Sequence, residues 1–424
     1  MPDESQAAAH CATNDLVGEL VFDVIVVGAR CAGAVTAMLL ARAGHKILLL
    51  DRAHFPSDTL STHYVHQPGL AHLHRWGLLE EVLATGCPTL TSLSFHSPGV
   101  RLAGPAPTLG AITGGCAPRR LVLDHILVRA AVEAGAEFRP CSNMLDLHWR
   151  DGAVAGVVHG TRNRTPQLER ASLVIGADGR NSTIARLTRA PYLRQDPRLT
   201  YTYYSYWSGI PQQGFRLYSV QGAGTACIPT HDDLTLLGLA FTRTGKPIDN
   251  RDRQQTYLSM LRQTSPELEQ QLADAHQEER LFCCADQPNF FRQPHGPGWA
   301  LVGDAAHTKD PGPARGITDA FTQADMLADH LNIPLDDHHQ VSEALTHYAQ
   351  WLSRAFDASY QYALHAARMD VNSHHQDLID NQHDPAYVDR VLRAYAGILE
   401  PSPRRNEPLV TGAPSRDPAQ VTPW

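Results

Sequence analysis

Lysine is almost missing from this sequence. The 424 residues include only Lys46, Lys246 and Lys309, so arginine carries nearly all of the positive charge. Any chemistry that depends on a lysine side chain therefore has few candidates. The formal net charge of -8 argues against nucleic acid as a partner, because proteins that bind phosphate backbones usually have a basic balance.

Long apolar runs, paired cysteines and metal-site spacings are missing too. No apolar run is long enough to span a membrane, and the acidic first twenty residues do not resemble a secretion signal. The eight cysteines contain no C-x-x-C pair, which favours reduced thiols in a cytoplasmic protein. The 23 histidines have no companion residues at the spacing of a known metal site, so we expect no metal.

Residues 22–50 have the pattern of a strand, a helix and a second strand. FDVIVV (22–27) and KILLL (46–50) are continuous apolar runs, which is typical of parallel strands buried on both faces. Between them, AGAVTAMLLARAG has helical spacing and ends at Gly44. This order predicts a βαβ nucleotide-binding unit at the start of the fold.

The turn of this unit, VVGARCAGA (26–34), is an incomplete G-x-G-x-x-G fingerprint. Gly28 permits a tight turn, Gly33 allows close packing of helix on strand, and the helix N-terminus suits a diphosphate. Asp51 ends the second strand, where an acidic residue can accept hydrogen bonds from an adenosine ribose. Arg30 replaces the middle glycine. We predict that its φ is negative and that its guanidinium lies at the diphosphate; the alternative is that it points to solvent.

Two later buried strands also end in acidic turns. Asp178 lies in GADGRNS, which taken alone is an ordinary turn. Gly303 and Asp304 begin GDAAHTKDPGPARGITDAF, where a carboxylate can bind ribityl or ribose hydroxyls. Gly316 gives freedom before a new helix, for which Thr318 is the predicted N-cap. The N-terminus of that helix suits the negative charge of a reduced flavin.

In this order, VVGARCAGA…LLLDR, GADGRNS and GDAAHTKDPGPARGITDA resemble the three fingerprints of FAD-dependent monooxygenases of the para-hydroxybenzoate hydroxylase superfamily. These are the group A flavoprotein aromatic hydroxylases, and geranylgeranyl reductases and flavin halogenases are related to them. The resemblance runs roughly from Val21 to Leu331. It implies an α/β fold with a discontinuous Rossmann-like FAD-binding domain, an inserted antiparallel or mixed β-sheet substrate domain, and C-terminal helices.

The aromatic, alternating strands between Tyr201 and Arg243 are typical of the inserted sheet. The predicted domains follow from the change between the buried-strand pattern of the three motifs and this aromatic, alternating pattern. They comprise a flexible leader (1–20), an FAD-binding domain (21–190 and 282–335), a substrate-binding sheet domain (191–281), C-terminal helices (336–400) and a proline-rich tail (401–424).

The resemblance, together with the arginine in the turn, assigns FAD contacts to residues in and beside the three motifs. Those residues are Gly28, Arg30, Gly33, Asp51, Arg52, Thr62, Arg120, Asp178, Gly303, Asp304, Pro311, Gly316 and Ile317. By the same resemblance, the first motif holds the ADP half and Arg120 reaches the ribityl or phosphate region. Asp178 is tied to FAD and to transient NAD(P)H contact, and Asp304 binds the ribityl chain. The loop proline faces the flavin, and the amides of Gly316 and Ile317 contact its pyrimidine edge.

Two residues are candidates for catalysis. The stretch DTLSTHYV (58–65) is expected to pass near the flavin, which makes His63 one of them. The strand YTYYSYW offers Tyr203, Tyr204 and Tyr206, with alternate residues sharing a face. We take Tyr204 as the second candidate. Ordinary packing is the alternative role for each of these side chains.

The predicted activity is that of an NADPH- or NADH-using monooxygenase. It would hydroxylate or epoxidise a fairly large aromatic or polycyclic substrate, of the kind found in secondary metabolism, with O2 through a flavin C4a-hydroperoxide. No second nucleotide-binding turn occurs, so the reductant visits transiently or a separate reductase supplies electrons. The alternatives are an FAD-dependent reductase of alkene or prenyl chains and a flavin-bound protein that catalyses a non-redox cyclisation.

Halogenation is the related chemistry that the residues favour least. A halogenase of this superfamily needs a lysine in its own lobe and a W-x-W-x-I-P segment. No lysine lies between Lys46 and Lys246, and YWSGIP (206–211) matches that segment only in part. Lys309, in the loop after Asp304, is the one lysine whose position keeps this possibility open.

Overall fold

The computed structural model describes residues 22–161, 165–243, 251–373 and 375–398. The predicted leader (1–20) and tail (401–424) lie outside these ranges. Among the described residues, no helix is long and apolar enough to cross a membrane. Nor do three or more His, Cys, Asp or Glu side chains from those ranges group as they would around a metal ion.

The predicted βαβ unit is confirmed. Strand β1 (Phe22–Val27), helix α1 (Cys31–Arg42) and strand β2 (Ile47–Leu50) follow one another, and β1 pairs in parallel with β2. On its other side β1 pairs in parallel with β12 (Gln167–Gly176). Both faces of β1 and β2 are covered, which explains their unbroken apolar sequences.

Around this centre the chain builds an eight-stranded sheet from distant segments. Its main strand order is β10-β11-β12-β1-β2-β9, with β22 beside β12 and β21 beside β22. The added strands are β9 (Glu137–Arg139), β10 (Asn143–Arg150), β11 (Ala153–Gly160), β21 (His295–Gly296) and β22 (Trp299–Leu301). Because β22 precedes the third motif, all three motifs reach the carboxyl ends of adjacent parallel strands, where α/β folds bind ligands.

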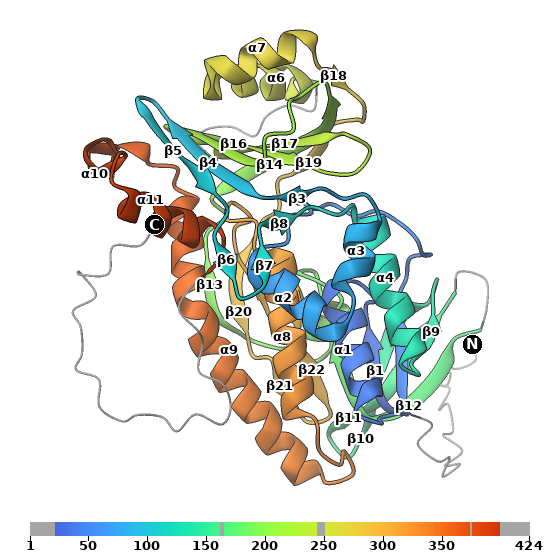
Figure 1. Cartoon of the computed structure of the whole chain (residues 1–424). Helices are drawn as coiled ribbons and strands as arrows, with labels where there is room; N and C mark the ends of the chain where they lie inside the picture. Colours follow the sequence, from blue (N-terminus) through green and yellow to red (C-terminus); the bar gives the residue numbers. More distant parts are fainter. Residues whose placement is uncertain (1–21, 162–164, 244–250, 374, 399–424) are drawn as a thin grey trace, which may run out of the picture.

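Helices cover both faces of this sheet (Figure 1). On one face, α1, α4 (Arg120–Glu133) and α8 (Gly316–His330) bury their apolar sides. On the other face the cover comes from α5 (Thr183–Leu187) and the long helix α9 (His338–Ala366). The hydrophobic cores on the two faces of this sheet therefore support the strands that carry the three motifs.

A second sheet lies above the first in the view of Figure 1. Its order is β18-β14-β17-β16-β15-β4-β5, and β19 also pairs with β14. The strands are β4 (Ser92–Ser97), β5 (Val100–Pro105), β14 (Thr200–Ser208), β15 (Phe215–Val220), β16 (Ala223–Pro229), β17 (Thr235–Thr242), β18 (His276–Gln277) and β19 (Phe282–Cys284). The pairs are antiparallel except β15 with β4, so the sheet is mixed.

The two faces of β14 have different neighbours. Tyr203 and Trp207 pack in a core with Tyr257 of helix α6 (Arg253–Thr264) and Leu268 of helix α7 (Pro266–Asp274). Tyr204 and Tyr206 belong to a separate cluster on the opposite face. The alternation predicted for this strand is therefore present, and it places Tyr203 on the face opposite Tyr204 and Tyr206.

Strand pairing departs from the predicted domain boundaries at two places. Strands β4 and β5, from the range 21–190 assigned to the FAD-binding domain, pair within the second sheet. Strand β19, at the start of the range 282–335, pairs with β14. The parallel partner of β4 is β15, which follows far later in the chain, so no local pattern marked this pairing. The division into domains itself stays a prediction.

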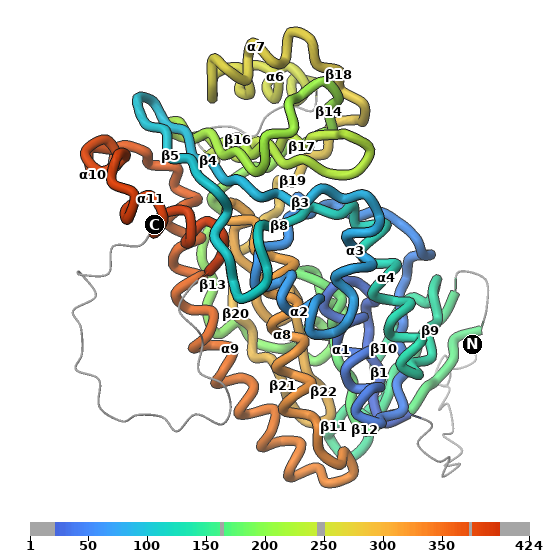
Figure 2. The backbone as a smooth tube through the Cα atoms, in the orientation of Figure 1, coloured from blue at the N-terminus to red at the C-terminus, as the bar shows by residue number. Residues whose placement is uncertain are grey.

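The remaining elements connect and flank the two sheets. They are α2 (Gln67–Trp76), α3 (Leu79–Ala84), β3 (Thr89–Leu90), β6 (Thr108–Leu109), β7 (Ile112–Thr113), β8 (Gly115–Cys116), β13 (Tyr192–Asp196), β20 (Asn289–Arg292), η1 (Gly303–Ala305), β23 (His307–Thr308), η2 (Val371–Ser373), α10 (His375–Asn381) and α11 (Pro385–Tyr395). Figure 2 shows the chain passing from α9 to α10 and α11, next to the second sheet. There α11 packs on β5.

A glycine-to-alanine pair tests the close approach at the first turn. A Cβ on Gly33 would lie 1.7 Å from Gly28 O, so Gly33→Ala should lower the free energy of unfolding by about 1–3 kcal/mol or more. In the control Gly160→Ala, the added Cβ comes no closer than 3.4 Å to any neighbour that the structure describes. That variant should keep its stability or gain about 0.5–1 kcal/mol. Urea unfolding measures both, and equal losses would contradict the packing role of Gly33.

Candidate active site

The first motif forms a tight turn between β1 and α1. Gly28 has φ +102°, and a Cβ there would lie 2.4 Å from Ala177 O. Arg30 has φ −97°, as predicted for a side chain in place of the middle glycine. Within the described chain no side chain caps the start of α1. The free N–H groups of its first turn therefore form an anion-binding end.

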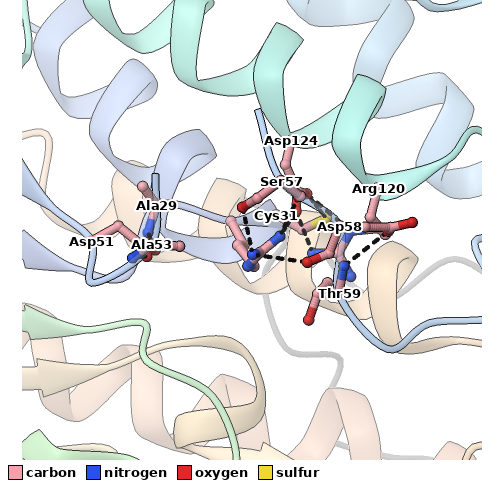
Figure 3. Close-up of polar contacts among 10 residues, drawn as sticks. Ala29, Cys31, Asp51, Ala53, Ser57, Asp58, Thr59, Arg120 and Asp124 are labelled. Carbon is pink, nitrogen blue, oxygen red and sulfur yellow. Dashed lines mark hydrogen bonds and ion pairs between the residues drawn. The ribbon is translucent and has the colours of Figure 1, made fainter. Parts of the chain in front are cut away.

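Asp51 ties the end of β2 to this turn. Its carboxylate accepts hydrogen bonds from the backbone N–H of Ala29 at 2.7 Å and of Ala53 at 2.8 Å (Figure 3). Each oxygen of a carboxylate can accept more than one hydrogen bond. Asp51 is therefore held rigidly and keeps acceptor capacity for a ribose. Arg52, the next residue, has an exposed side chain.

A buried carboxylate that the sequence analysis missed lies beside the turn. Asp124 Oδ2 accepts from Arg30 Nη1 at 2.7 Å and from Arg120 Nη2 at 3.0 Å. Its Oδ1 accepts from Arg120 Nε at 2.9 Å and from Cys31 Sγ at 3.4 Å. Two guanidiniums and one carboxylate leave a net positive charge at the N-terminal end of α1. The available signal was the spacing of Asp124 four residues after Arg120, which on a helix places two side chains next to each other.

The second motif ends in a carboxylate with one unused oxygen. Asp178 Oδ2 accepts from the backbone N–H of Thr183 at 2.6 Å and of Ile184 at 3.2 Å, at the start of α5. Its Oδ1 is buried and has no hydrogen-bond partner in the described chain. Burial raises the pKa of this carboxyl. Asp178 therefore has a structural role in α5 and one acceptor left for a ligand.

In the third motif, Gly303 has φ +65° and leads into Asp304. The side chain of Asp304 is accessible to solvent, whereas the residues on either side of it are buried. Its surroundings still desolvate it and raise its pKa, although the charges of Arg180, Lys309 and Arg120 act in the opposite direction.

Helix α8 begins earlier than predicted. Its first residue is Gly316, so the prediction of Thr318 as N-cap is wrong. Thr318 is buried in the first turn, and its hydroxyl accepts a hydrogen bond from the backbone N–H of His66 at 3.2 Å. Ala314, with φ +54°, makes the preceding turn, after the partly buried Pro311. The helix starts without a side-chain cap from any described residue, so the amides of Gly316 and Ile317 stay available.

Lys309 is not a free amine. Its ammonium pairs with Asp319 in the first turns of α8, and both side chains are almost fully buried. Arg315 Nε reaches the other oxygen of Asp319 at 3.3 Å. Burial alone would raise the pKa of Asp319, but Lys309 and Arg315 outweigh it and lower the pKa. This lysine therefore neutralises a buried carboxylate.

Of the two candidate catalytic residues, His63 contacts strand β14 of the second sheet through a tyrosine other than the predicted one. His63 is fully buried with φ +63°, and its Nε2 shares a hydrogen bond with Tyr206 Oη. Its Nδ1 is buried and has no partner among the described residues. Tyr204 Oη instead accepts from the backbone N–H of Ser61 at 3.2 Å. The structure therefore pairs His63 with Tyr206 rather than with Tyr204; Thr62 is partly buried between these contacts.

Both members of this pair are neutral at neutral pH. Burial lowers the pKa of His63 to about 3. Burial also raises the pKa of Tyr206, while the nearby Arg119 acts in the opposite direction. The Arg119 guanidinium lies 4.0 Å from the centre of the Tyr206 ring. It also pairs with Asp58 at 2.9 Å and Glu279 at 2.8 Å, an arrangement that no sequence motif indicated.

A family model described as an FAD binding domain matches residues 21–350. The chain belongs to this family. It is an enzyme of the FAD-dependent monooxygenase and oxidoreductase group, which confirms the predicted resemblance.

Relatives with different activities share the sequence pattern. The 6-methylpretetramide 4-monooxygenase of Streptomyces rimosus is 25% identical over 314 residues, which cover 71% of this chain and 73% of that protein. The digeranylgeranylglycerophospholipid reductase 2 of Methanothermobacter thermautotrophicus is 31% identical over 167 residues. That match spans 39% of this chain and only 41% of the reductase.

Solved structures show the same fold. The flavin-dependent brominase Bmp2 has a TM-score of 0.76 at 18% identity, over 89% of this chain and 93% of that one. PqsL of Pseudomonas aeruginosa has a TM-score of 0.70 at 20% identity, over 87% of this chain and 99% of that one. The predicted α/β fold class is therefore confirmed.

Stability at acid pH tests the burial of His63. Its pKa is about 6.5 unfolded and about 3 folded, so its contribution to stability is present above pH 6.5 and is lost as the pH falls toward 3. The free energy of unfolding should therefore fall less steeply between pH 6.5 and 4 in His63→Asn, since asparagine tolerates the left-handed backbone. Exposed His347→Asn is the control and should keep the wild-type slope. Identical slopes in all three proteins would contradict a buried neutral His63.

Proposed function

We propose that this enzyme uses FAD, NADPH or NADH, and O2 to hydroxylate or epoxidise a fairly large aromatic or polycyclic molecule. The observation that carries the proposal is the neutral His63–Tyr206 pair, enclosed by aromatic side chains between the second sheet and the loop before α8. Such a site offers hydrogen bonds to a substrate within buried, largely apolar surroundings, and oxygen chemistry on a reduced flavin requires water to be excluded.

Aromatic rings form the surroundings of this pair. Tyr204 stacks on Phe282, with ring centres 5.0 Å apart and planes 13° apart. Tyr64 lies against Phe215 with ring centres 4.7 Å apart. The same hydrophobic cluster extends to Ala314 in the loop that precedes α8. Flat, polarisable side chains next to the proposed flavin loop favour an aromatic substrate over a strongly charged one.

The residues of the three motifs fit FAD. The uncapped start of α1 and the guanidinium of Arg120 would hold the diphosphate, and Asp51 the adenosine ribose. Asp304 would bind the ribityl chain, with Asp178 offering its unpartnered Oδ1 nearby. When bound, FAD supplies the hydride acceptor for NAD(P)H and the centre that activates O2.

The proposed flavin end is the start of α8. There the amides of Gly316 and Ile317 would face the pyrimidine edge, and the helix N-terminus favours negative charge on it. Pro311 and Thr62 would flank the ring, while exposed Arg52 would reach the adenosine end.

His63 and Tyr206 would bind the reacting group of the substrate by hydrogen bonds. With its proton on Nε2, His63 donates to Tyr206 Oη, which leaves the tyrosine hydroxyl free to donate to the substrate. Arg119 over the Tyr206 ring favours the charged form of that side chain. Nδ1 of His63, which has no partner among the described residues, gives the pair a second polar atom for a bound substrate.

The relatives support two versions of the chemistry. The Streptomyces rimosus monooxygenase, aligned over most of both chains, supports oxidation of a polycyclic substrate. The Methanothermobacter reductase supports an FAD-dependent reduction of prenyl chains as the second candidate. A non-redox cyclisation needs the same cofactor site. A separate reductase protein is an alternative electron source to NADPH or NADH.

Oxygen uptake separates these functions. The holoenzyme is given NADPH or NADH with polycyclic aromatic polyketides or with prenyl-chain alkenes, in air and under nitrogen. We expect NAD(P)H oxidation and O2 consumption to rise together with an aromatic compound. Anaerobic reduction of an alkene would instead establish the reductase, and turnover without NAD(P)H loss would establish a non-redox enzyme.

Removing one hydroxyl tests the His63–Tyr206 pair. Tyr206→Phe should lower kcat by about 10²–10³-fold, the usual cost of removing one hydrogen-bond donor to the reacting group, while FAD binding is retained. Tyr203→Phe is the matched control, since Tyr203 lies on the other face of β14. Steady-state kinetics on the substrate identified by oxygen uptake gives both values. Equal effects of the two substitutions would remove Tyr206 from the mechanism.

A further inference from the structure

Arg30 directs its guanidinium at the segment before the active site. Nη1 donates to Asp124 Oδ2 at 2.7 Å and to Ser57 O at 3.2 Å. Nη2 donates to Ser57 Oγ at 3.3 Å and to Asp58 O at 3.4 Å. The guanidinium also lies 5.4 Å from the centre of the Phe55 ring. Figure 3 shows Ser57, Asp58 and Asp124 gathered at this point.

Arg120 uses its nitrogens differently. It binds Asp124 through Nε and Nη2, and its Nη1 makes no hydrogen bond within the described residues. Arg120 therefore has a whole nitrogen left for a phosphate oxygen. Arg30 has both terminal nitrogens occupied by α4 and by residues 57 and 58.

The segment that Arg30 holds leads directly to the candidate catalytic pair. The carboxylate of Asp58 binds Arg119 at 2.9 Å, and His63 follows with a left-handed backbone. A non-glycine residue in that conformation persists only where its surroundings hold it, at a cost of about 1–3 kcal/mol. Arg30 and Arg119 supply contacts of this kind ahead of His63.

We infer that Arg30 is a positioning residue. Its hydrogen bonds fix residues 55–63 against the turn of the first motif, between β1 and α1, and so place His63 beside Tyr206. In this role the arginine that replaces the middle glycine of the fingerprint acts on the active-site segment and makes little contribution to diphosphate binding. The inference rests on the FAD binding and the His63–Tyr206 chemistry of the proposed function.

The substitution Arg30→Lys tests whether the segment needs the shape of the guanidinium or only its positive charge. In Arg30→Lys, one ammonium can pair with Asp124 but cannot also reach Ser57 and Asp58, because it lacks the planar fork of arginine. Arg30→Gln removes the charge as well. Arg120→Gln removes the guanidinium that faces the cofactor, and Arg129→Gln, at an exposed position further along α4, is the matched control.

The experiment measures hydrogen exchange of the peptide covering residues 55–63 and the Kd for FAD in each variant. Exchange is followed in flavin-free and FAD-loaded protein, and Kd by flavin fluorescence. Both Arg30 variants should speed exchange in this peptide about tenfold while changing Kd less than about threefold. Arg120→Gln should raise Kd about tenfold and leave the exchange unchanged, and Arg129→Gln should change neither.

Two results would overturn the inference. One is unchanged exchange in both Arg30 variants. The other is an increase in Kd in Arg30→Gln that equals that of Arg120→Gln and is reversed in Arg30→Lys, because the charge at position 30 would then serve the diphosphate. If wild-type protein binds no FAD, the proposed function fails, whereas exchange in the flavin-free variants still tests the fastening of residues 55–63.

Discussion

The carboxylate of Asp124 is the shared anchor of the cofactor turn and the active-site segment. It is fully buried, and four donors from Arg30, Cys31 and Arg120 surround it. A buried charge is tolerated only when it is paired and hydrogen-bonded, and two adjacent guanidiniums would repel each other without it. These contacts therefore fix three segments relative to one another: the N-terminus of α1, the start of α4 and the segment at Ser57.

From this anchor, charged contacts continue to the second sheet. Asp58 and Glu279 hold Arg119, and Arg119 lies over the ring of Tyr206. The proposed reaction centre is consequently aromatic in its interior and bounded by paired charges. Burial keeps His63 and Tyr206 neutral, although Arg119 favours the charged form of Tyr206.

Local patterns in the sequence predicted the cofactor frame well. The strands of the βαβ unit are continuous apolar runs because both their faces are covered, and Gly28 and Gly33 mark a turn that forbids a Cβ. The alternation on β14 also predicted that Tyr204 and Tyr206 share a face. Each of these features depends on residues within one element or one turn.

Contacts between distant segments could not be predicted in the same way. His63 meets Tyr206 across 143 positions of the chain, and Arg30 meets Asp124 across 94. Both pairings depend on how the two sheets and α4 pack together. The start of α8 was misplaced because Thr318 has the chemistry of a cap, whereas its hydroxyl is used by the backbone N–H of His66.

The most direct test of this account is a titration of flavin-free protein with FAD, comparing wild type with Asp124→Asn. Wild type should bind one FAD per chain. Asp124→Asn, which leaves two guanidiniums without their carboxylate, should bind at least about tenfold more weakly while its circular dichroism spectrum stays that of the folded protein. Equal affinities in two folded proteins would contradict the central role given to Asp124.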